Sequence, residues 1–376
     1  MNELERFKTV VNFEKPDYWP LIVTMAGYMI GKGGMIKLHR EGMPEWVNDN
    51  ENWCRYWGQG MIDQAEHIGA GKKQTKEEKW IEGDFEYTRY ESGALIKRVK
   101  DHETNYSMPE FIEFAVRDRA SFERLKTFDY TYASKEKLAA QVKKFKNRSR
   151  PLLVQAGRTW GMVRDAMGPE RALYAIYDDP ALVRDMISYQ LHFVEQFVFP
   201  VIEALRPEAV NLWEDFCYNH GLMFSPAVFR EFCAPYYKRV AAFARDCGVK
   251  MLVVDTDGKV DEFCLLLEEF GFNAIWPLEQ VCGNPLLEYR KRQPNLIMSG
   301  GIEKEITNSG NGDRIEPELS KLPPVLEKSG YFPSFDHALQ IIVGFEELCR
   351  TMTRLHEICG SAELGEFPRK RGQHRC

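Results

Sequence analysis

The sequence predicts an α/β protein, a single (β/α)8 TIM barrel with N-terminal helical and β-hairpin decorations. Three observations predict it. Short apolar runs recur along the second half of the chain, most of them precede a helix with recognisable ends, and the loops between them are short. Runs of this kind suit parallel strands that are buried on both faces. Repeated strand–helix units with short loops place the helices outside a parallel sheet.

Five of the expected strands lie in the second half of the chain, at 209–213, 249–255, 273–277, 295–299 and 330–334. The helices between them have typical end signals. Ser225 and Pro226 are the residue types preferred at an N-cap and at the first helical position. A helix at 260–270 is expected to end at Gly271. Another is expected to begin at Asn284-Pro285, and the last covers 339–359 and ends before Gly360.

The first half of the chain supplies the remaining elements. Strands are expected at 19–24, around 62–70 and at 152–157, which brings the count to eight, and helices are expected at 161–176 and 180–205. Residues 84–99 alternate on both sides of Ser92-Gly93, as in a β-hairpin. A doubly wound parallel sheet is the competing arrangement.

The chain is expected to form one domain. No Pro- or Ser-rich linker and no internal repeat divides it, so the barrel domain is predicted to cover 1–360. The remaining segment, 361–376, is rich in basic residues and is predicted to be a disordered tail.

Composition excludes several classes of protein. The chain has 376 residues, with 50 Lys and Arg against 56 Asp and Glu, and a net charge of −6. This mild acidity argues against a dedicated nucleic-acid binder. No apolar run approaches the roughly 18 residues of a membrane span, and the charged N-terminus lacks the apolar core of a signal peptide. The nine cysteines include no C-x-x-C pair, so a reducing, cytoplasmic location is expected, with no membrane partner.

Acidic residues follow the expected strands of the second half. In parallel β/α folds, functional groups gather at the carboxyl ends of the strands. The sequence therefore predicts a site at one mouth of the barrel. Its candidate catalytic residues are Asp257, His337, Glu214 and Asp255, and its candidate metal ligands are Asp257, Glu279 and His337. Such oxygen and nitrogen ligands suit zinc or a harder cation, and without a metal the same carboxylates could transfer protons.

Three tryptophans and one arginine lie near the same strand ends. Trp160, Trp213 and Trp276 are predicted to line a pocket for an aromatic or methylated cationic substrate, although burial in the core is the alternative for each. Arg158, just past its strand, is predicted to orient a substrate carboxylate, and a plain surface position is its alternative.

Several stretches of the second half resemble those of a known superfamily. They are WEDFCYNHGLMFSPAVFREFCAPYYKRV, VVDTDGKVDEF, WPLEQVCGNP, IMSGGIEK and GYFPSFDHAL, in the same order and spacing as in the uroporphyrinogen decarboxylase superfamily. The resemblance covers roughly 150–358 and implies a (β/α)8 barrel. The superfamily includes decarboxylases of heme synthesis and methyltransferases that move methyl groups to or from a corrinoid.

The sequence differs from the motifs of both the decarboxylases and the methyltransferases of this superfamily, and the differences favour the methyltransferases. The decarboxylases carry the arginine-rich segment MRQAGRY after their first strand, whereas residues 24–29 here read TMAGYM and lack both arginines. A polyanionic tetrapyrrole would then be poorly held. The coenzyme M-type methyltransferases hold zinc through H-x-C and a later cysteine. Those positions fall on Asp255-Thr256-Asp257 and on His337, so the resemblance implies an oxygen/nitrogen metal site instead of a thiolate one.

The sequence therefore predicts a corrinoid-dependent methyltransferase that acts on a small O- or N-methylated compound. The chain has no recognisable corrinoid-binding segment, so the corrinoid is expected on a partner protein that docks over the barrel mouth. Two alternatives stay open. One is a cofactor-free decarboxylase of a tetrapyrrole or a smaller acid, and the other is a non-catalytic corrinoid or tetrapyrrole carrier. The oligomeric state, including a homo-oligomer, is left open.

Overall fold

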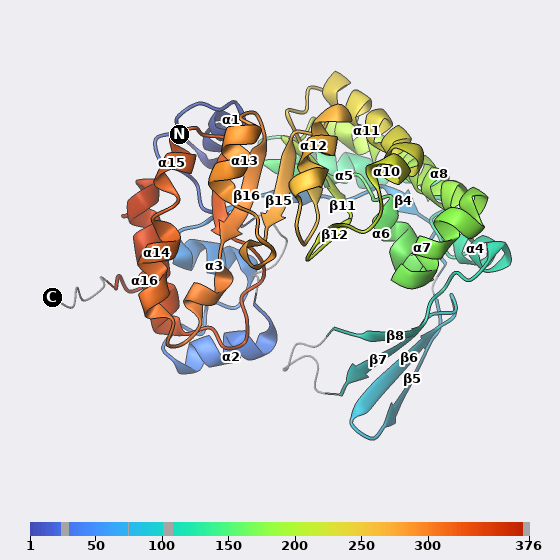
Figure 1. The fold of residues 1–376 in the computed structure, drawn as a ribbon, viewed down its shortest axis with the longest axis horizontal. Coiled ribbons are helices and arrows are strands. Elements are labelled where there is room, and N and C mark those ends of the chain that lie inside the picture. Colours follow the sequence, from blue (N-terminus) through green and yellow to red (C-terminus); the bar gives the residue numbers. More distant parts are fainter. Residues whose placement is uncertain (24–29, 74, 101–107, 371–376) are drawn as a thin grey trace.

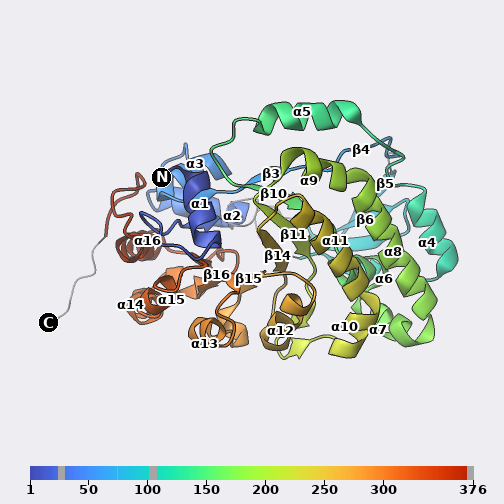
Figure 2. The same ribbon diagram turned by 90° about the horizontal axis from the view of Figure 1, so that it is seen from above.

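The core of the protein is a curled parallel sheet surrounded by helices (Figure 1, Figure 2). The computed structural model describes residues 1–23, 30–73, 75–100 and 108–370. Seven parallel strands pair in the order β17-β16-β15-β14-β11-β10-β3. Their bounds are β3 Asp63–Ala65, β10 Leu152–Gln155, β11 Ala209–Trp213, β14 Met251–Asp255, β15 Ala274–Leu278, β16 Ile297–Ile302 and β17 Tyr331–Phe335.

A further strand occupies the position next to β17. β1 (Ile22–Val23) lies beside β17 and pairs in parallel with β2 (Gly60–Met61), which leads into β3. The arrangement confirms the predicted TIM-barrel-like α/β fold and argues against the doubly wound alternative. Residue 24 of the expected strand at 19–24 lies outside the described residues.

Prolines divide three of the expected helices. The segment 161–176 forms α6 (Trp160–Met167) and α7 (Pro169–Asp178), and 180–205 forms α8 (Pro180–Phe197) and α9 (Phe199–Leu205). The helix that Ser225 caps stops at Phe232, as α10 (Pro226–Phe232), and α11 (Ala234–Asp246) follows it. Proline has no N–H group for the helical ladder, so a helix breaks or restarts at Pro169, Pro200 and Pro235.

The remaining barrel helices are α12 (Asp261–Glu269), α13 (Leu286–Arg292), α14 (Ile315–Leu319), α15 (Pro323–Leu326) and α16 (Phe345–Cys359). α16 begins six residues later than expected from 339–359. The strand expected at 295–299 continues to Ile302 through Gly300 and Gly301, which have φ of 93° and 78°. A Cβ atom at Gly300 would lie 2.5 Å from the backbone N of Leu278, so glycine is needed for this close strand pairing.

Apolar side chains fill one end of the barrel. Inward-facing residues of alternate strand positions form a buried cluster with Phe7, Val10 and Val11 of α1 (Glu3–Val11). The rings of Phe7 and Phe332 stack with their centroids 5.0 Å apart. α1 therefore closes the amino ends of the strands, and the carboxyl ends remain for the site.

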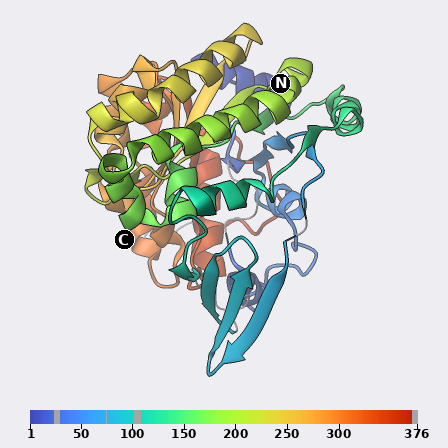
Figure 3. The same ribbon diagram turned by 90° about the vertical axis from the view of Figure 1, so that its right-hand side faces the viewer.

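The expected hairpin is part of a larger antiparallel sheet that projects from the barrel (Figure 3). Its strands pair in the order β5-β6-β7-β8, and the hairpin at 84–99 corresponds to β6 and β7. Their bounds are β5 Glu77–Glu82, β6 Phe85–Tyr90, β7 Leu95–Val99 and β8 Glu110–Glu113. The N-terminal helical decorations are α2 (Lys32–Arg40) and α3 (Asn50–Trp57).

Smaller elements complete the described chain: α4 (Arg119–Lys126), α5 (Lys135–Phe145), β4 (Gly69–Ala70), β9 (Tyr132–Ala133), β12 (Cys217–Tyr218) and β13 (Gly221–Leu222). Among the helices of the described residues, none combines the length and apolar character that crossing a bilayer requires.

The first part of the predicted tail packs against the barrel. Phe367 is 4% exposed, and its ring centroid lies 5.0 Å from that of Trp57 in α3 and 5.8 Å from that of His356 in α16. Burial of the Phe367 ring fixes this segment despite its basic composition, which had suggested disorder. Residues 361–370 therefore pack against the barrel. Residues 371–376 lie outside the described part.

We expect Phe367→Ala to lower the free energy of unfolding by about 3 kcal/mol, because it removes a buried aromatic ring. Urea denaturation measures this. Tyr177→Ala is the matched control, because Tyr177 is 74% exposed and its loss should change stability by no more than about 0.5 kcal/mol. A Phe367→Ala variant as stable as the wild type would show that the tail contributes nothing.

Candidate active site at the barrel mouth

The candidate metal ligands from three loops meet at the carboxyl ends of the strands. Asp257 follows β14, Glu279 follows β15 and His337 follows β17. One ligand atom from each of the three side chains lies within 4.8 Å of the others. His337 Nε2 is 3.7 Å from Asp257 Oδ2, and this interaction raises the pKa of His337 while burial opposes the rise. The structure therefore brings the predicted ligand set together.

Backbone hydrogen bonds fix the loops that carry these ligands. Glu279 Oε2 accepts a hydrogen bond of 2.7 Å from the backbone N–H of Gly258, which follows Asp257. Asn284 Nδ2 donates to the carbonyl oxygens of Gly258 and Glu279, both at 2.8 Å. Asp336, next to His337, accepts from the backbone N–H of Gln280 at 2.8 Å. These bonds join the loop after β15 to the loops after β14 and β17, so the three ligand-bearing loops are held side by side.

Gly258 makes a tight turn directly after Asp257. Its φ is 86°, a conformation that suits glycine. A Cβ atom there would lie 2.7 Å from the backbone N and O of Tyr218. The chain can therefore turn sharply only with glycine at this position.

A second group of acids overlaps the first. Asp215, Asp255 and Asp257 each place a carboxylate oxygen within 4.8 Å of the others. Asp255 is the last residue of β14 and is 6% exposed. Burial and the charges of Asp215 and Asp257 raise its pKa to about 8. Burial also raises the pKa of Asp215, while Arg164 opposes that rise.

Glu214 does not face the mouth. Its side chain is fully buried, and Oε1 accepts from the backbone N–H of Thr159 at 2.7 Å and from Thr159 Oγ1 at 2.8 Å. The N–H of Gly161 donates to Oε2 at 3.1 Å, and Tyr237 Oη donates to Oε1 at 3.2 Å. Burial raises the pKa of Glu214 to about 7 against these donors. The carboxylate anchors the start of α6 instead of reaching the mouth as predicted.

Two of the four predicted substrate-binding residues lie at the rim. Trp213 is 49% exposed, and the guanidinium carbon of Arg158 lies 5.2 Å from its ring centroid. Arg158 also forms a 2.6 Å ion pair with Asp165. Trp160 and Trp276 are each 2% exposed. Trp160 packs on Phe224 in the core and Trp276 lies inside the barrel, so their predicted place in a pocket wall is corrected to core positions.

We expect truncation of a buried tryptophan to lower stability much more than truncation of an exposed one. Trp160→Ala should lower the free energy of unfolding by about 3–5 kcal/mol, because it removes a fully buried ring. Trp213→Ala should change it by no more than about 0.5 kcal/mol, because the ring is half exposed. Urea denaturation of the two variants side by side tests this. Equal losses would mean that Trp213 belongs to the core.

Two residues of this region, Asp215 and Cys282, were not among the predicted catalytic, substrate-binding or metal-binding residues. The sequence does carry a signal for Asp215. Side chains two positions apart along a strand point to the same face, so Asp215 shares the face of Trp213, whereas Glu214 points to the opposite face. Cys282 follows Glu279 in a short 3-10 turn, Gln280–Cys282, and its Sγ lies 3.6 Å from Glu279 Oε2. Burial and nearby carboxylates raise the pKa of Cys282 to about 11. Its place depends on the loop conformation, for which the sequence carries no signal.

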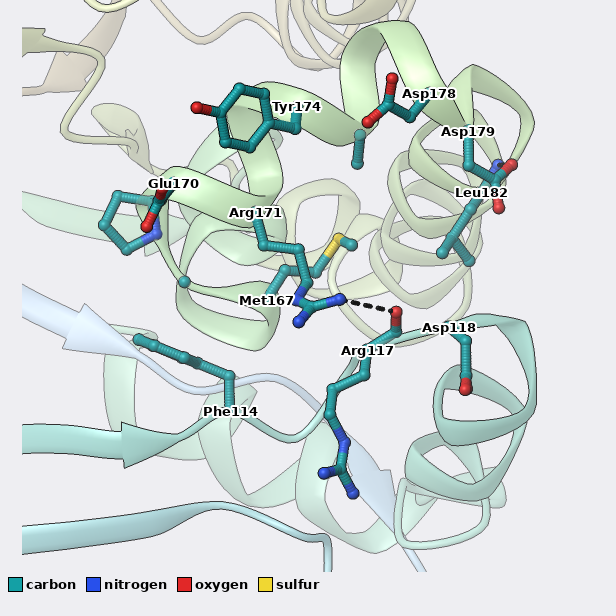
Figure 4. Close-up of a pocket in the computed structure, with 13 residues that line it drawn as sticks. Phe114, Arg117, Asp118, Met167, Glu170, Arg171, Tyr174, Asp178, Asp179 and Leu182 are labelled. Carbon is teal, nitrogen blue, oxygen red and sulfur yellow. Dashed lines mark hydrogen bonds between the residues drawn. The ribbon is translucent and has the colours of Figure 1, made fainter.

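A cavity of about 820 Å³ lies apart from the acids, between the segment after β8 and the helices α6, α7 and α8 (Figure 4). Phe114, Arg117, Arg171 and Tyr174 are among its lining residues, and Arg171 donates to the carbonyl oxygen of Arg117 at 3.3 Å. None of the predicted site residues lines it. The chemistry-bearing groups therefore mark the barrel mouth, not this cavity, as the candidate active site.

Comparisons with known proteins bear on the fold. No protein-family model matches the chain, and no curated protein matches it in sequence. Among solved structures, a methyltransferase from Methanosarcina mazei is similar, with a TM-score of 0.55 and 10% identity. The alignment covers 93% of this chain and 96% of that chain. The likeness is one of fold. It supports the barrel architecture, while the resemblance to the uroporphyrinogen decarboxylase superfamily stays a prediction from the sequence.

Proposed function

We propose that the protein is a methyltransferase that moves a methyl group between a small O- or N-methylated compound and a corrinoid on a partner protein. The observation that carries the proposal is the convergence of Asp257, Glu279 and His337 at the carboxyl ends of the strands. The shared fold with a methyltransferase supports the reaction class. The partner would dock over the same mouth, because the methyl group must reach the corrinoid there.

The residues present fit a divalent cation. Two carboxylates and an imidazole are a ligand set that zinc and similar ions accept, and catalytic zinc sites have three protein ligands with one position open. A bound cation would polarise the heteroatom that carries the methyl group, as a Lewis acid. Glu279 Oε2 is held by the backbone N–H of Gly258 and lies 3.6 Å from Cys282 Sγ, which leaves Oε1 as the oxygen that could bind the cation.

The other residues of the mouth bind and orient the substrate. The exposed face of Trp213 suits an aromatic ring or a methylated cation. Arg158 lies beside it and can receive a substrate carboxylate in exchange for Asp165. When the methyl group leaves, the heteroatom keeps the electron pair of the broken bond and takes up a proton from water at the mouth.

Methyl transfer to free cob(I)alamin, followed by the change in its visible absorption, tests the proposal with a panel of O- and N-methylated compounds. We expect turnover with at least one class, and a loss of at least about 100-fold in His337→Ala, because a ligand is removed. His192→Ala is the control, since His192 is an exposed histidine of α8. Unchanged turnover in His337→Ala, or no transfer from any compound, would contradict the proposal.

A further inference from the structure

The two acidic groups at the mouth share one residue, Asp257. We propose that the mouth binds two divalent cations, the first at Asp257, Glu279 and His337 and the second at Asp215, Asp255 and Asp257. The role of the first cation rests on the function proposed above. The second site is an addition that no comparison assigns.

The strongest observation for the second cation is the environment of Asp255. Its side chain is nine-tenths buried, and its carboxylate lies within 4.8 Å of those of Asp215 and Asp257. Among the described residues, the Asp255 carboxylate accepts no hydrogen bond of ordinary geometry. The indole N–H of Trp276 lies close enough to lower the pKa of Asp255, and that buried N–H has no other partner. Buried carboxylates are normally paired, and a cation held by Asp215, Asp255 and Asp257 would pair this one.

Few basic side chains of the described residues pair with the acids of the mouth. Arg164 of α6 binds Asp215 Oδ2 at 3.0 Å, and it also binds Asp165 at 3.0 Å. His337 Nε2 lies 3.7 Å from Asp257 Oδ2. Among the described residues, no ion pair to a basic side chain involves Asp255 or Glu279. A second divalent cation would replace the repulsion between the three aspartates with attraction.

The ligand set indicates the class of ion and of substrate. Three carboxylates form a hard oxygen site, which suits Mg²⁺, Mn²⁺ or Ca²⁺ better than soft metals. In known two-metal sites the ions lie about 3.5–4 Å apart and stabilise oxygens that gain negative charge in a displacement, and a pair of cations held here would supply the same stabilisation. This arrangement favours methyl ethers over methylamines as substrates, because the departing oxygen is left with negative charge.

Binding of Mn²⁺ to the metal-free full-length protein tests the second site. We expect calorimetry to give two Mn²⁺ per chain for the wild type, with the spin-coupled paramagnetic resonance spectrum of a close pair. Asp215→Asn should bind one Mn²⁺ and give the spectrum of an isolated ion. Asp255→Asn should behave in the same way, and circular dichroism checks that both variants are folded. Asp165→Asn is the matched control, because Asp165 shares Arg164 with Asp215 but belongs to neither group.

The outcomes separate this inference from the proposed function. A single Mn²⁺ that is lost in His337→Ala would overturn the second site and leave the first intact. Two uncoupled ions, or a coupled pair that persists in both Asp215→Asn and Asp255→Asn, would also overturn it. A coupled pair lost in those variants, together with no methyl transfer from any compound, would support the two-cation site and contradict the methyltransferase.

Discussion

Replacing Asp257 with alanine is expected to abolish binding of divalent cations and to lower methyl transfer more than any other single change at the mouth. Asp257 is the one residue that belongs to both candidate ligand groups, and His337 Nε2 lies 3.7 Å from its Oδ2. Its removal takes a ligand from each of the two proposed cation sites and also removes the ion-pair partner of His337. We expect a loss of turnover of at least about 1,000-fold, against about 100-fold for His337→Ala.

The measurement is methyl transfer at saturating methyl donor, with metal content determined on the same samples. Glu262→Ala is the control, because Glu262 is an exposed acid in α12, the helix that follows Asp257. Wild-type turnover in Asp257→Ala would remove the acidic mouth from the mechanism.

Replacing Glu214 with alanine is expected to have a large effect on stability, a loss of about 3–5 kcal/mol in the free energy of unfolding, comparable to that of Trp160→Ala. The substitution leaves the N–H groups of Thr159 and Gly161 and the hydroxyl of Tyr237 without their acceptor. Each buried group left unpaired costs about 1–3 kcal/mol. Because Glu214 anchors the segment after Arg158, the variant should also weaken substrate binding. Urea denaturation measures the loss, and a Glu214→Ala variant within about 1 kcal/mol of the wild type would contradict the anchoring role.

The same residue predicts a dependence of stability on pH. Burial raises the pKa of Glu214 from 4.5 to about 7 in the folded protein, so the folded state binds the proton more tightly than the unfolded state. The contribution of Glu214 to stability is therefore fully present below pH 4.5 and declines as the pH rises towards 7. Glu214→Gln, which cannot ionise, should lack this decline. Parallel pH profiles for the wild type and Glu214→Gln would contradict the shift.

The position of the site could be predicted from the sequence because it follows from one rule. Apolar runs locate the strands, and the carboxyl ends of parallel strands meet at one mouth. Asp257, Glu279 and His337 come together on this basis, although they are separated by up to 80 positions in the chain. Short loops leave little freedom at these positions, which is why the rule suffices.

The errors at the site have local physical causes. Glu214 and Asp215 both follow β11, and side chains that alternate along a strand cannot both face the mouth. Applying that alternation to Trp213 would have selected Asp215. Trp160 lies in the first turn of α6 and Trp276 inside the barrel, and their depth depends on neighbouring elements that a local pattern does not describe.

The structure differs from the predicted fold in two ways, one of which the sequence could have shown. Pro169, Pro200 and Pro235 were visible breakers in the sequence, so the divided helices were predictable. The packing of Phe367 on Trp57 was not, because the two residues are distant in the chain and the segment that carries Phe367 has the basic composition of a tail. The basic composition of 361–376 predicts an exposed segment on average, but it does not show that a single apolar ring, Phe367, is buried against the barrel.

The metal content of the protein tests whether the barrel mouth is a metal site. Inductively coupled plasma mass spectrometry of the purified protein, wild type beside His337→Ala, after incubation with zinc and removal of excess, gives ions per chain. We expect at least one divalent ion per wild-type chain and at least one fewer in His337→Ala. No ion in the wild type, or an equal content in the two proteins, would contradict this expectation.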